Sequence, residues 1–184
     1  MTEWGISTER LTLRQFKKSD LEALLVYRND PDVSRYQGWG ASYSSEQATE
    51  FIDEMSTREV GQIGWTQLAI ELKSTGETIG DVALNTLEFE PRSAMIGYTL
   101  ARESWGQGYA IEAVTAVVKH CFENLNMHRI RANCDTRNES SWQLLEKIGC
   151  RREAHCIESY LEGETWCDEF EYALLEREWF GLKQ

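Results

Sequence analysis

The residues best suited to bind a charged ligand form the segment Trp105-Gly106-Gln107-Gly108-Tyr109-Ala110. An alternating apolar run precedes this segment, and a strongly amphipathic run follows it. Glycines let backbone N–H groups approach a guest, and the N-terminus of a helix adds positive partial charge. The segment therefore predicts an anion-binding turn at the start of a helix, with phosphate as the expected guest.

Two common nucleotide-binding motifs do not fit this segment. The dinucleotide fingerprint needs a third glycine, and Ile111 occupies that position. A nucleotide P-loop needs Gly-Lys followed by Ser or Thr, which the sequence lacks. Without further context, a Gly-x-Gly segment before a helix is also typical of an ordinary turn. Residues outside the segment are therefore needed to distinguish a ligand-binding site from an ordinary turn.

The elements that position this segment can be predicted from the spacing of apolar residues. Alternation predicts strands over 10–14, 65–72, 78–85, 94–101, 128–134, 155–160 and 169–175. Spacing of three and four residues predicts helices that begin near Ser19 and Ser44, span 110–125, and begin again at Asn138. This order mixes hairpins with two α-connected crossovers. We therefore expect one domain over residues 1–184, of α/β or α+β class, with a mixed sheet.

The wider context of the glycine segment resembles the GNAT superfamily of N-acetyltransferases. From Trp105 to Ala113 the sequence is W-G-Q-G-Y-A-I-E-A, and N-x-x-S at Asn138 to Ser141 is followed by L-L-E-K-I-G-C. More narrowly, the chain resembles the branch that contains the ribosomal-protein alanine and serine N-terminal acetyltransferases. That branch shares a T-E-R-L-x-L-R strand, here at 8–14, and a tail motif, here at 163–168. Trp105 stands where the superfamily motif has Gln or Arg, a frequent replacement in the branch.

The resemblance implies a GNAT fold, in which helices flank a mixed twisted sheet that is splayed between its fourth and fifth strands. It also implies acetyl-CoA as the cofactor, with its pyrophosphate on the N–H groups of the glycine segment. Backbone groups of the preceding strand would pair with the pantetheine arm as a neighbouring strand does. The residues expected to bind acetyl-CoA are Tyr98, Leu100, Trp105, Gly106, Gln107, Gly108, Tyr109, Ala110, Asn138 and Ser141.

Direct attack of an amine on a thioester needs groups that remove one proton and supply another, and it needs no metal. Many relatives use a tyrosine to protonate the leaving thiolate, but Leu145 occupies the aligned position here. Ser141, near the expected sulfur, is the predicted catalytic acid, and Cys134 is an alternative group beside the thioester. The general base stays open among ordered water and the side chains of Glu88, Asp81 and Tyr98.

Composition limits the other functional classes. The net charge of the 184 residues is −12, and of four segments only 98–152 holds more basic than acidic side chains, eight against six. An anionic ligand is expected in that segment, whereas the acidic remainder disfavours nucleic acid and suits a cationic amine. The five cysteines include no C-x-x-C pair, which argues against a disulfide framework or a zinc site. No apolar stretch could span a membrane, so we expect a cytoplasmic protein.

These observations predict an acetyl-CoA-dependent N-acetyltransferase that acts on a primary amine. Three acceptor classes stay open: a protein N-terminus such as that of a basic ribosomal protein, an amino sugar, and a small cationic amine. The acidic N-terminal half and tail are expected to form the acceptor side, with Tyr36 and Trp39 lining it. The alternatives are a non-catalytic acyl-CoA sensor or scaffold, motivated by Leu145, and a protein that keeps the fold without binding CoA. The family also suggests a homodimer.

Overall fold

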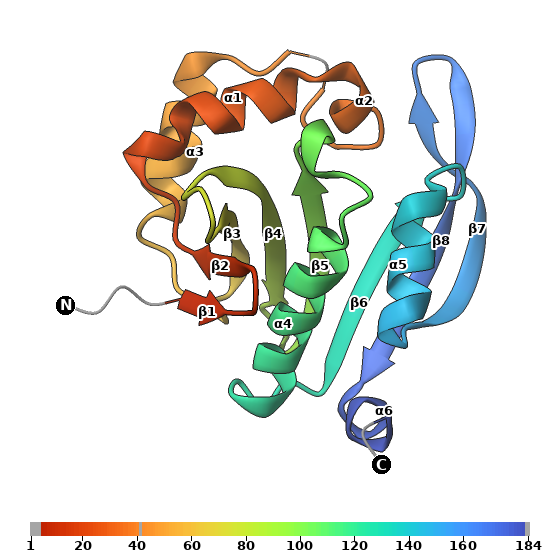
Figure 1. Cartoon of the computed structure of the whole chain (residues 1–184). Helices are drawn as coiled ribbons and strands as arrows, with labels where there is room; N and C mark the ends of the chain where they lie inside the picture. The colour runs from red at the N-terminus through yellow and green to blue at the C-terminus, as the bar shows by residue number, and fades with distance from the viewer. Residues whose placement is uncertain (1–4, 41, 183–184) are drawn as a thin grey trace.

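A computed structural model describes residues 5–40 and 42–182, and one eight-stranded sheet forms its centre (Figure 1). The strand order is β1-β2-β3-β4-β5-β6-β8-β7, and neighbours are antiparallel except β5 and β6, which are parallel. The strands are β1 Gly5–Ser7, β2 Leu11–Arg14, β3 Gly64–Leu72, β4 Thr78–Leu87, β5 Glu90–Leu100, β6 Arg129–Asp135, β7 Arg151–Glu162 and β8 Thr165–Leu175. The mixed sheet confirms the predicted fold class.

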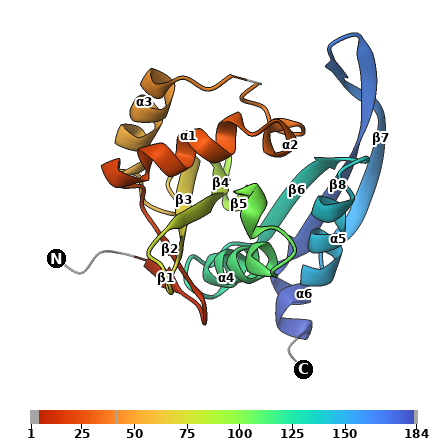
Figure 2. The ribbon, with the colours of Figure 1, turned by 45° about the horizontal axis from the view of Figure 1, so that its top comes forward.

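Helices cover both faces of this sheet. They are α1 Leu21–Asn29, α2 Pro31–Ser34, α3 Ser45–Met55, α4 Tyr109–Glu123, α5 Glu139–Ile148 and α6 Glu176–Gly181. Figures 1 and 2 show α4 and α5 on one face and α1 and α3 together on the other. Within the described part of the chain, none of these helices is long and apolar enough to cross a membrane.

The two core layers follow from alternation along the central strands. In β3, Leu68 and Ile70 are buried in the layer that α4 covers, whereas Ala69 is buried in the layer that α1 and α3 cover. The buried stripe of α4 consists of Ala113, Val114, Val117, Val118, Cys121 and Phe122. The predicted amphipathic helix is therefore confirmed, and it begins where the glycine segment ends.

The sheet opens between β5 and β6, which are the fourth and fifth of the predicted strands. Their ladder joins Ser93–Met95 to Arg129–Arg131, and the carbonyl of Arg92 accepts a hydrogen bond from the β6 side just before it. Backbone groups alternate in direction along a strand, so those of Tyr98 and Leu100 share the edge of Arg92. The ladder has ended by that point, which leaves this edge open toward β6. The predicted splay is confirmed.

Short elements and one cap were missed or wrong in the sequence prediction. β1, α2 and α6 have three to six residues, too few for a periodic pattern to appear. A 3₁₀ turn at Lys18–Asp20, rather than a cap at Ser19, precedes α1. The Asp20 carboxylate stabilises that turn by accepting the backbone N–H three residues earlier at 2.7 Å and pairing with Arg14 at 2.8 Å. The predicted cap at Ser44 is confirmed.

The last two strands are longer than the sequence predicts. β7 begins at Arg151 instead of residue 155, and β8 begins at Thr165 instead of residue 169. Most side chains of β7 are exposed, so this strand lacks the alternation that marks a half-buried strand. Figure 1 shows that the resulting hairpin extends beyond the end of β6.

A charged cluster lies buried between α1 and the sheet. The Asp81 carboxylate accepts the Tyr27 hydroxyl at 2.7 Å, and the Arg28 guanidinium lies 3.8 Å from it and donates to Gln67 at 3.0 Å. The guanidinium lies 4.1–4.8 Å from the centres of three aromatic rings, those of Trp39, Tyr43 and Phe51. Burial raises the pKa of Asp81, and the charge of Arg28 opposes this rise. The positive charge of Arg28 therefore partly compensates for the burial of a carboxylate that is almost inaccessible to solvent.

Candidate active site

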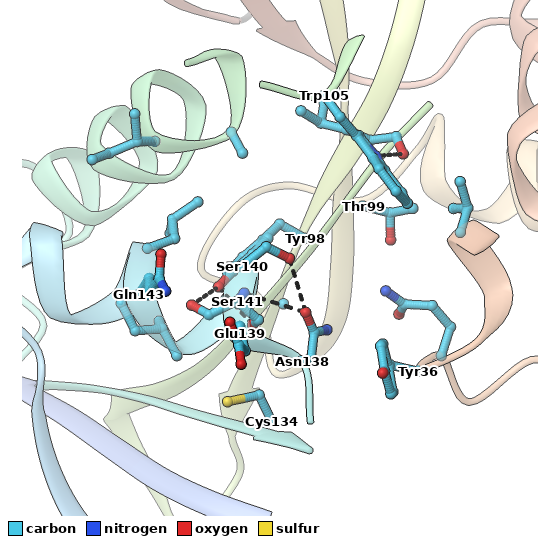
Figure 3. Close-up of a pocket in the computed structure, with 18 of the residues that line it drawn as sticks. Tyr36, Tyr98, Thr99, Trp105, Cys134, Asn138, Glu139, Ser140, Ser141 and Gln143 are labelled. Atoms are coloured by element: carbon cyan, nitrogen blue, oxygen red, sulfur yellow. Dashed lines mark hydrogen bonds between the residues drawn. The ribbon is translucent and has the colours of Figure 1, made fainter. Parts of the chain in front are cut away.

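A cleft of about 830 Å³ lies where β5 and β6 separate. It is lined by the ends of both strands, the glycine segment, the first turn of α5, and α2 with the loop after it (Figure 3). Most residues predicted to bind the cofactor line this cleft: Tyr98, Leu100, Trp105, Gly106, Gly108, Tyr109, Ala110, Asn138 and Ser141. Gln107 does not line it, because its side chain turns back and donates to Glu103 O at 2.8 Å.

Two glycines shape the segment before α4. Gly106 has φ +71° and Gly108 has φ +79°, a left-handed conformation that glycine adopts most easily. A Cβ at Gly106 would meet no atom within 4 Å, so the backbone there faces open space. α4 begins at Tyr109, and Gly108 before it offers no side chain to cap the helix. The N–H groups of that first turn therefore suit an anion such as phosphate.

Arg10 holds the glycine segment in place, a role that no local sequence pattern indicates. Its Nη1 donates to Gln107 O at 2.9 Å, and its guanidinium lies 4.5 Å from the centre of the Tyr109 ring. Glu112, in the first turn of α4, accepts from Arg10 Nε at 2.7 Å and from the Thr8 hydroxyl at 2.6 Å. Burial would raise the pKa of Glu112, but these hydrogen bonds outweigh it and lower that pKa. Glu112 thus fastens the β1–β2 turn to α4.

Trp105 forms one wall of the cleft and braces the end of β5. Its indole Nε1 donates to Leu100 O at 2.9 Å, while 47% of the residue stays exposed (Figure 3). An indole has one donor and no acceptor, so this bond uses its whole hydrogen-bonding capacity. The replacement of Gln or Arg by Trp105 therefore gives support to the strand end through the indole and leaves anion binding to the backbone of the glycine segment.

The first turn of α5 places Ser141 against Tyr98. Asn138 caps this helix as predicted, since its Oδ1 accepts from Ser141 N at 3.3 Å and from Ser140 Oγ at 3.0 Å. The Tyr98 hydroxyl lies 3.0 Å from Ser141 O and 2.9 Å from Ser141 Oγ (Figure 3). Burial raises the pKa of Tyr98, which keeps its single proton on the ring oxygen. When Tyr98 donates to the carbonyl, Ser141 is the donor in the second contact.

Comparison with known protein families identifies the family of this chain. A family model described as an acetyltransferase (GNAT) domain matches residues 10–151. This chain belongs to the GNAT acetyltransferases. The match includes every element that lines the cleft, from α2 to the first turn of α5.

Some relatives of this GNAT chain are named without an acceptor, and others are named for a ribosomal protein. The protein named uncharacterized N-acetyltransferase p20, from Bacillus licheniformis, is 33% identical over 175 residues, or 95% of this chain and 97% of that protein. The ribosomal protein uS5-alanine N-acetyltransferase of Escherichia coli is 30% identical over 84 residues, or 46% and 43% of the two chains. The latter supports the predicted resemblance to the ribosomal-protein branch.

Solved structures share the GNAT fold. A GNAT-family acetyltransferase from Bacillus anthracis is 30% identical, with a TM-score of 0.85 over 95% of this chain and 100% of that one. The spermidine N-acetyltransferase from Vibrio cholerae, solved with CoA and spermine, is 21% identical, with a TM-score of 0.81 over 94% and 99% of the two chains. This second likeness is one of fold, so it does not identify the acceptor of the present chain.

Cys134 and Leu145 differ in what they offer to this GNAT site. Cys134 lines the cleft at the end of β6, and burial raises its pKa to about 11 although a hydrogen bond with Ser141 opposes this rise. Its thiol is therefore protonated at neutral pH. Leu145, which the sequence resemblance aligns with a tyrosine, is 1% exposed and offers no hydroxyl. Proton donors near the start of α5 thus come from Ser141, Tyr98 and Cys134.

Two of the three side chains considered as general base lie outside the cleft. Glu88 is in the turn between β4 and β5, at the opposite end of β5 from Leu100. Asp81 is 2% exposed and hydrogen-bonded to Tyr27 between α1 and the sheet. Tyr98 lines the cleft, but its raised pKa makes it a poor base at neutral pH. Ordered water is the remaining candidate of those considered.

The two aromatic residues expected on the acceptor side have different places. Tyr36, in the loop after α2, lines the cleft. Trp39 instead donates from its indole nitrogen to Arg28 O at 3.1 Å and packs over the buried guanidinium. The expectation for Trp39 was therefore wrong, because a buried cation draws its ring into the layer under α1.

The end of the cleft beside α2 and Tyr36, where the acceptor is expected, is less acidic than the segment charges predict. Asp32 pairs with Arg102 at 2.8 Å, and Asp135 pairs with Arg137 at 2.5 Å. Arg35 also lines this end. Of these two carboxylates, only Asp32 belongs to the acidic N-terminal half, and both are paired with arginine. No residue of the acidic tail lines the cleft, so the expected contribution of the tail is wrong. Within the described residues, no group of three or more His, Cys, Asp or Glu side chains could hold a metal ion.

Proposed function

We propose that this protein transfers the acetyl group of acetyl-CoA to a primary amine by direct attack. The observation that supports this most directly is the open edge of β5, which leads into the glycine segment and the start of α4. A ligand with an amide-bearing arm and a diphosphate needs a strand edge and an anion-binding turn next to each other. The two features occur here in that order along the cleft.

The residues present fit acetyl-CoA. Backbone groups of Tyr98 and Leu100 would hold the pantetheine arm. The N–H groups of Gly106 to Ala110 would hold the diphosphate. Asn138 and Ser141 would contact the cofactor from α5. When bound, acetyl-CoA supplies a thioester whose acetyl carbon an amine can attack. The open space above Gly106 and the absence of a capping side chain at Gly108 support this assignment.

We assign Ser141 as the catalytic acid. Its Oγ can pass its proton to the sulfur as the C–S bond breaks and take up the proton that the attacking nitrogen loses, so that the serine hydroxyl is restored. The Tyr98 hydroxyl, 2.9 Å away, orients that Oγ. The acceptor amine must be neutral to attack, so its ammonium form first loses a proton, which ordered water in the cleft can accept. Cys134 lies beside Ser141 and stays protonated, so no second negative charge develops next to the reacting atoms.

The acceptor would enter at the end of the cleft bounded by α2 and Tyr36. A protein N-terminus, an amino sugar and a small amine such as a polyamine all offer the required primary amine. The relative named for uS5 alanine and the structure named for spermidine represent two of these classes. Because the carboxylates at this end are paired with arginines, hydrogen bonds must contribute to holding the acceptor.

Incubation with acetyl-CoA and a pooled panel of peptide N-termini, aminoglycosides and polyamines tests this function. Mass spectrometry is the suitable readout, because the five free cysteines would react with a thiol dye. A gain of one acetyl group on one class would support the enzyme and identify its acceptor class. No gain on any class, with cofactor binding measured by calorimetry, would instead favour the non-catalytic sensor.

Gly108→Trp is expected to weaken acetyl-CoA binding at least tenfold, or about 1.4 kcal/mol. The Gly108 backbone has φ +79°, and a Cβ there would lie 3.4 Å from Arg10 Nη2, so an indole would distort the turn and fill the anion space. Calorimetry measures the dissociation constant. Gly181→Trp is the matched control, since a Cβ at Gly181 meets nothing within 4 Å and α6 lies away from the cleft. Unchanged affinity in Gly108→Trp would contradict the site assignment.

A further inference from the structure

The tip of the β7–β8 hairpin projects past the rest of the sheet. β8 pairs with β6 as far as Asp135 and Glu169, and Thr136 N then donates to Asp168 O at 3.1 Å. Beyond this point β7 and β8 pair with each other, and Figures 1 and 2 show the hairpin rising past α5 toward the side of α2. Two-stranded hairpins are marginally stable by themselves. The tip therefore depends on contacts with the rest of the molecule.

A bulge separates this tip from the base of the hairpin. The register of β7 against β8 shifts between Cys156 and Tyr160, and Glu158 within that stretch has φ +50°. A positive φ at a residue other than glycine is unfavourable, and a bulge locally disrupts the ladder. The tip is thus connected to the base through a weakened part of the hairpin.

One guanidinium ties the tip to the connection between β6 and α5. Arg137 Nη2 donates to Glu162 at 2.9 Å and to Asp135 at 2.5 Å, and it lies 3.4 Å from the Tyr160 hydroxyl. Tyr160 also donates to Asp135, whose side chain is 3% exposed. Burial would raise the pKa of Asp135, but the bonds from Arg137 and Tyr160 outweigh it and lower that pKa. We refer to Arg137, Asp135, Tyr160 and Glu162 as the Arg137 latch.

The Arg137 latch lies at the acceptor end of the cleft. Both Asp135 and Arg137 line the cleft, and the Arg137 guanidinium lies 5.7 Å from the centre of the Tyr36 ring. Three segments therefore meet at this side chain: the loop after α2, the β6–α5 connection and the hairpin tip. The hairpin tip itself contributes no residue to the lining of the cleft, so it borders the acceptor end through Arg137.

We propose that Arg137 is a positioning residue for the acceptor, because it holds the hairpin tip against the acceptor end of the cleft. This inference rests on the proposed acetyl transfer. The hydrogen bonds of the Arg137 guanidinium go to Asp135, Tyr160 and Glu162, and none goes to the glycine segment or to the open edge of β5. Loss of Arg137 should therefore weaken the use of the acceptor and leave cofactor binding unchanged.

Arg129→Gln is the matched control for Arg137→Gln. Arg129 also joins β6 to β7, through an ion pair with Glu153, but it lies at the far end of β6 and does not line the cleft. Arg137→Lys keeps the charge while losing the branched donor that reaches Asp135 and Glu162 together. The three variants separate a general loss of an ion pair from loss of the latch.

The first readout is amide hydrogen exchange in residues 157–167 without any ligand. Arg137→Gln should speed this exchange about tenfold, since hydrogen bonds to charged groups are lost, whereas Arg129→Gln should not. The second is steady-state kinetics with the acceptor found in the acetylation panel. Arg137→Gln should raise the acceptor KM about tenfold and keep the acetyl-CoA dissociation constant within about twofold, with partial recovery in Arg137→Lys.

Wild-type exchange rates in Arg137→Gln would overturn the latch. So would an unchanged acceptor KM, or an equal loss in Arg129→Gln. Failure of the proposed function is a separate result: the wild-type protein would acetylate no member of the panel, while the exchange experiment still decides whether Arg137 holds the hairpin tip.

Discussion

Ser141→Ala is expected to lower kcat about 100-fold, because general acid catalysis contributes about 10²- to 10⁴-fold. The acetyl-CoA dissociation constant should change less than about threefold, since the Ser141 hydroxyl is only one of the groups assigned to the cofactor and the arm and diphosphate are assigned to backbone groups of other segments. The structural basis is the position of Ser141 in the first turn of α5, where its Oγ lies 2.9 Å from the Tyr98 hydroxyl. Single-turnover kinetics with saturating acetyl-CoA measures the effect on the chemical step.

Ser140→Ala is the control for this experiment. Its hydroxyl donates to Asn138 Oδ1 at 3.0 Å, so the variant changes the same helical turn without removing the assigned acid. Tyr98→Phe should lie between the two in kcat, because it removes the hydroxyl that orients Ser141 and keeps the acid itself. If Ser141→Ala kept the wild-type kcat while Cys134→Ala lost it, the acid would be the thiol.

Arg28→Met is expected to destabilise the fold by about 3–5 kcal/mol, the usual cost of leaving one partner of a buried ion pair alone. The Arg28 side chain is 4% exposed and lies 3.8 Å from the Asp81 carboxylate, which is 3% exposed. Methionine retains apolar contact with the surrounding rings and removes the charge. The free energy of unfolding in urea measures the loss. Arg92→Met is the control, since the Arg92 side chain is 59% exposed and lies 3.9 Å from the Glu176 carboxylate. Such surface ion pairs contribute about 0–1 kcal/mol to stability.

The loss in Arg28→Met should grow as the pH rises. Burial already raises the pKa of Asp81 in the folded state, and without Arg28 that pKa rises further. The folded state then binds a proton that the unfolded state releases above about pH 4, so stability falls as the pH increases from there toward the folded pKa. Urea titrations at pH 5 and pH 8 should therefore give the larger loss at pH 8. An equal loss at both values would show that Asp81 keeps the same protonation state in the variant.

Local patterns in the sequence predicted the central sheet, the α4 stripe and the glycine segment, because these depend on residues close together in the chain. The ion pair between Arg10 and Glu112 joins residues 102 positions apart in the sequence, so no local pattern could indicate it. The sequence likewise leaves Asp81 among the possible bases, because it does not show that α1 buries this carboxylate with Tyr27 and Arg28.

Segment charges place the glycine segment and α5 in the one segment with excess basic residues, which agrees with the proposed cofactor side. They give an incomplete picture of the acceptor side, because counting cannot reveal that Arg102 neutralises Asp32 or that Arg137 crosses to Glu162 on the hairpin. Ion pairs between residues far apart in the sequence therefore determine how much negative charge a ligand encounters in the cleft.

The short ladder between β5 and β6 also has a mechanical consequence. This ladder, the seam between the two parts of the sheet, ends at Met95, five residues before Leu100. Because β5 stays paired with β4 as far as Leu100, the two strands would turn together about the seam, with an arm of about 17 Å at 3.3 Å per residue. A rotation of about 10° at the seam would move the strand end by about 3 Å. Ala94 and Ile130, which face each other in the seam and are fully buried, thus control the width of the gap from its closed end. Substitutions there could tune the fit of a bound arm without contacting it.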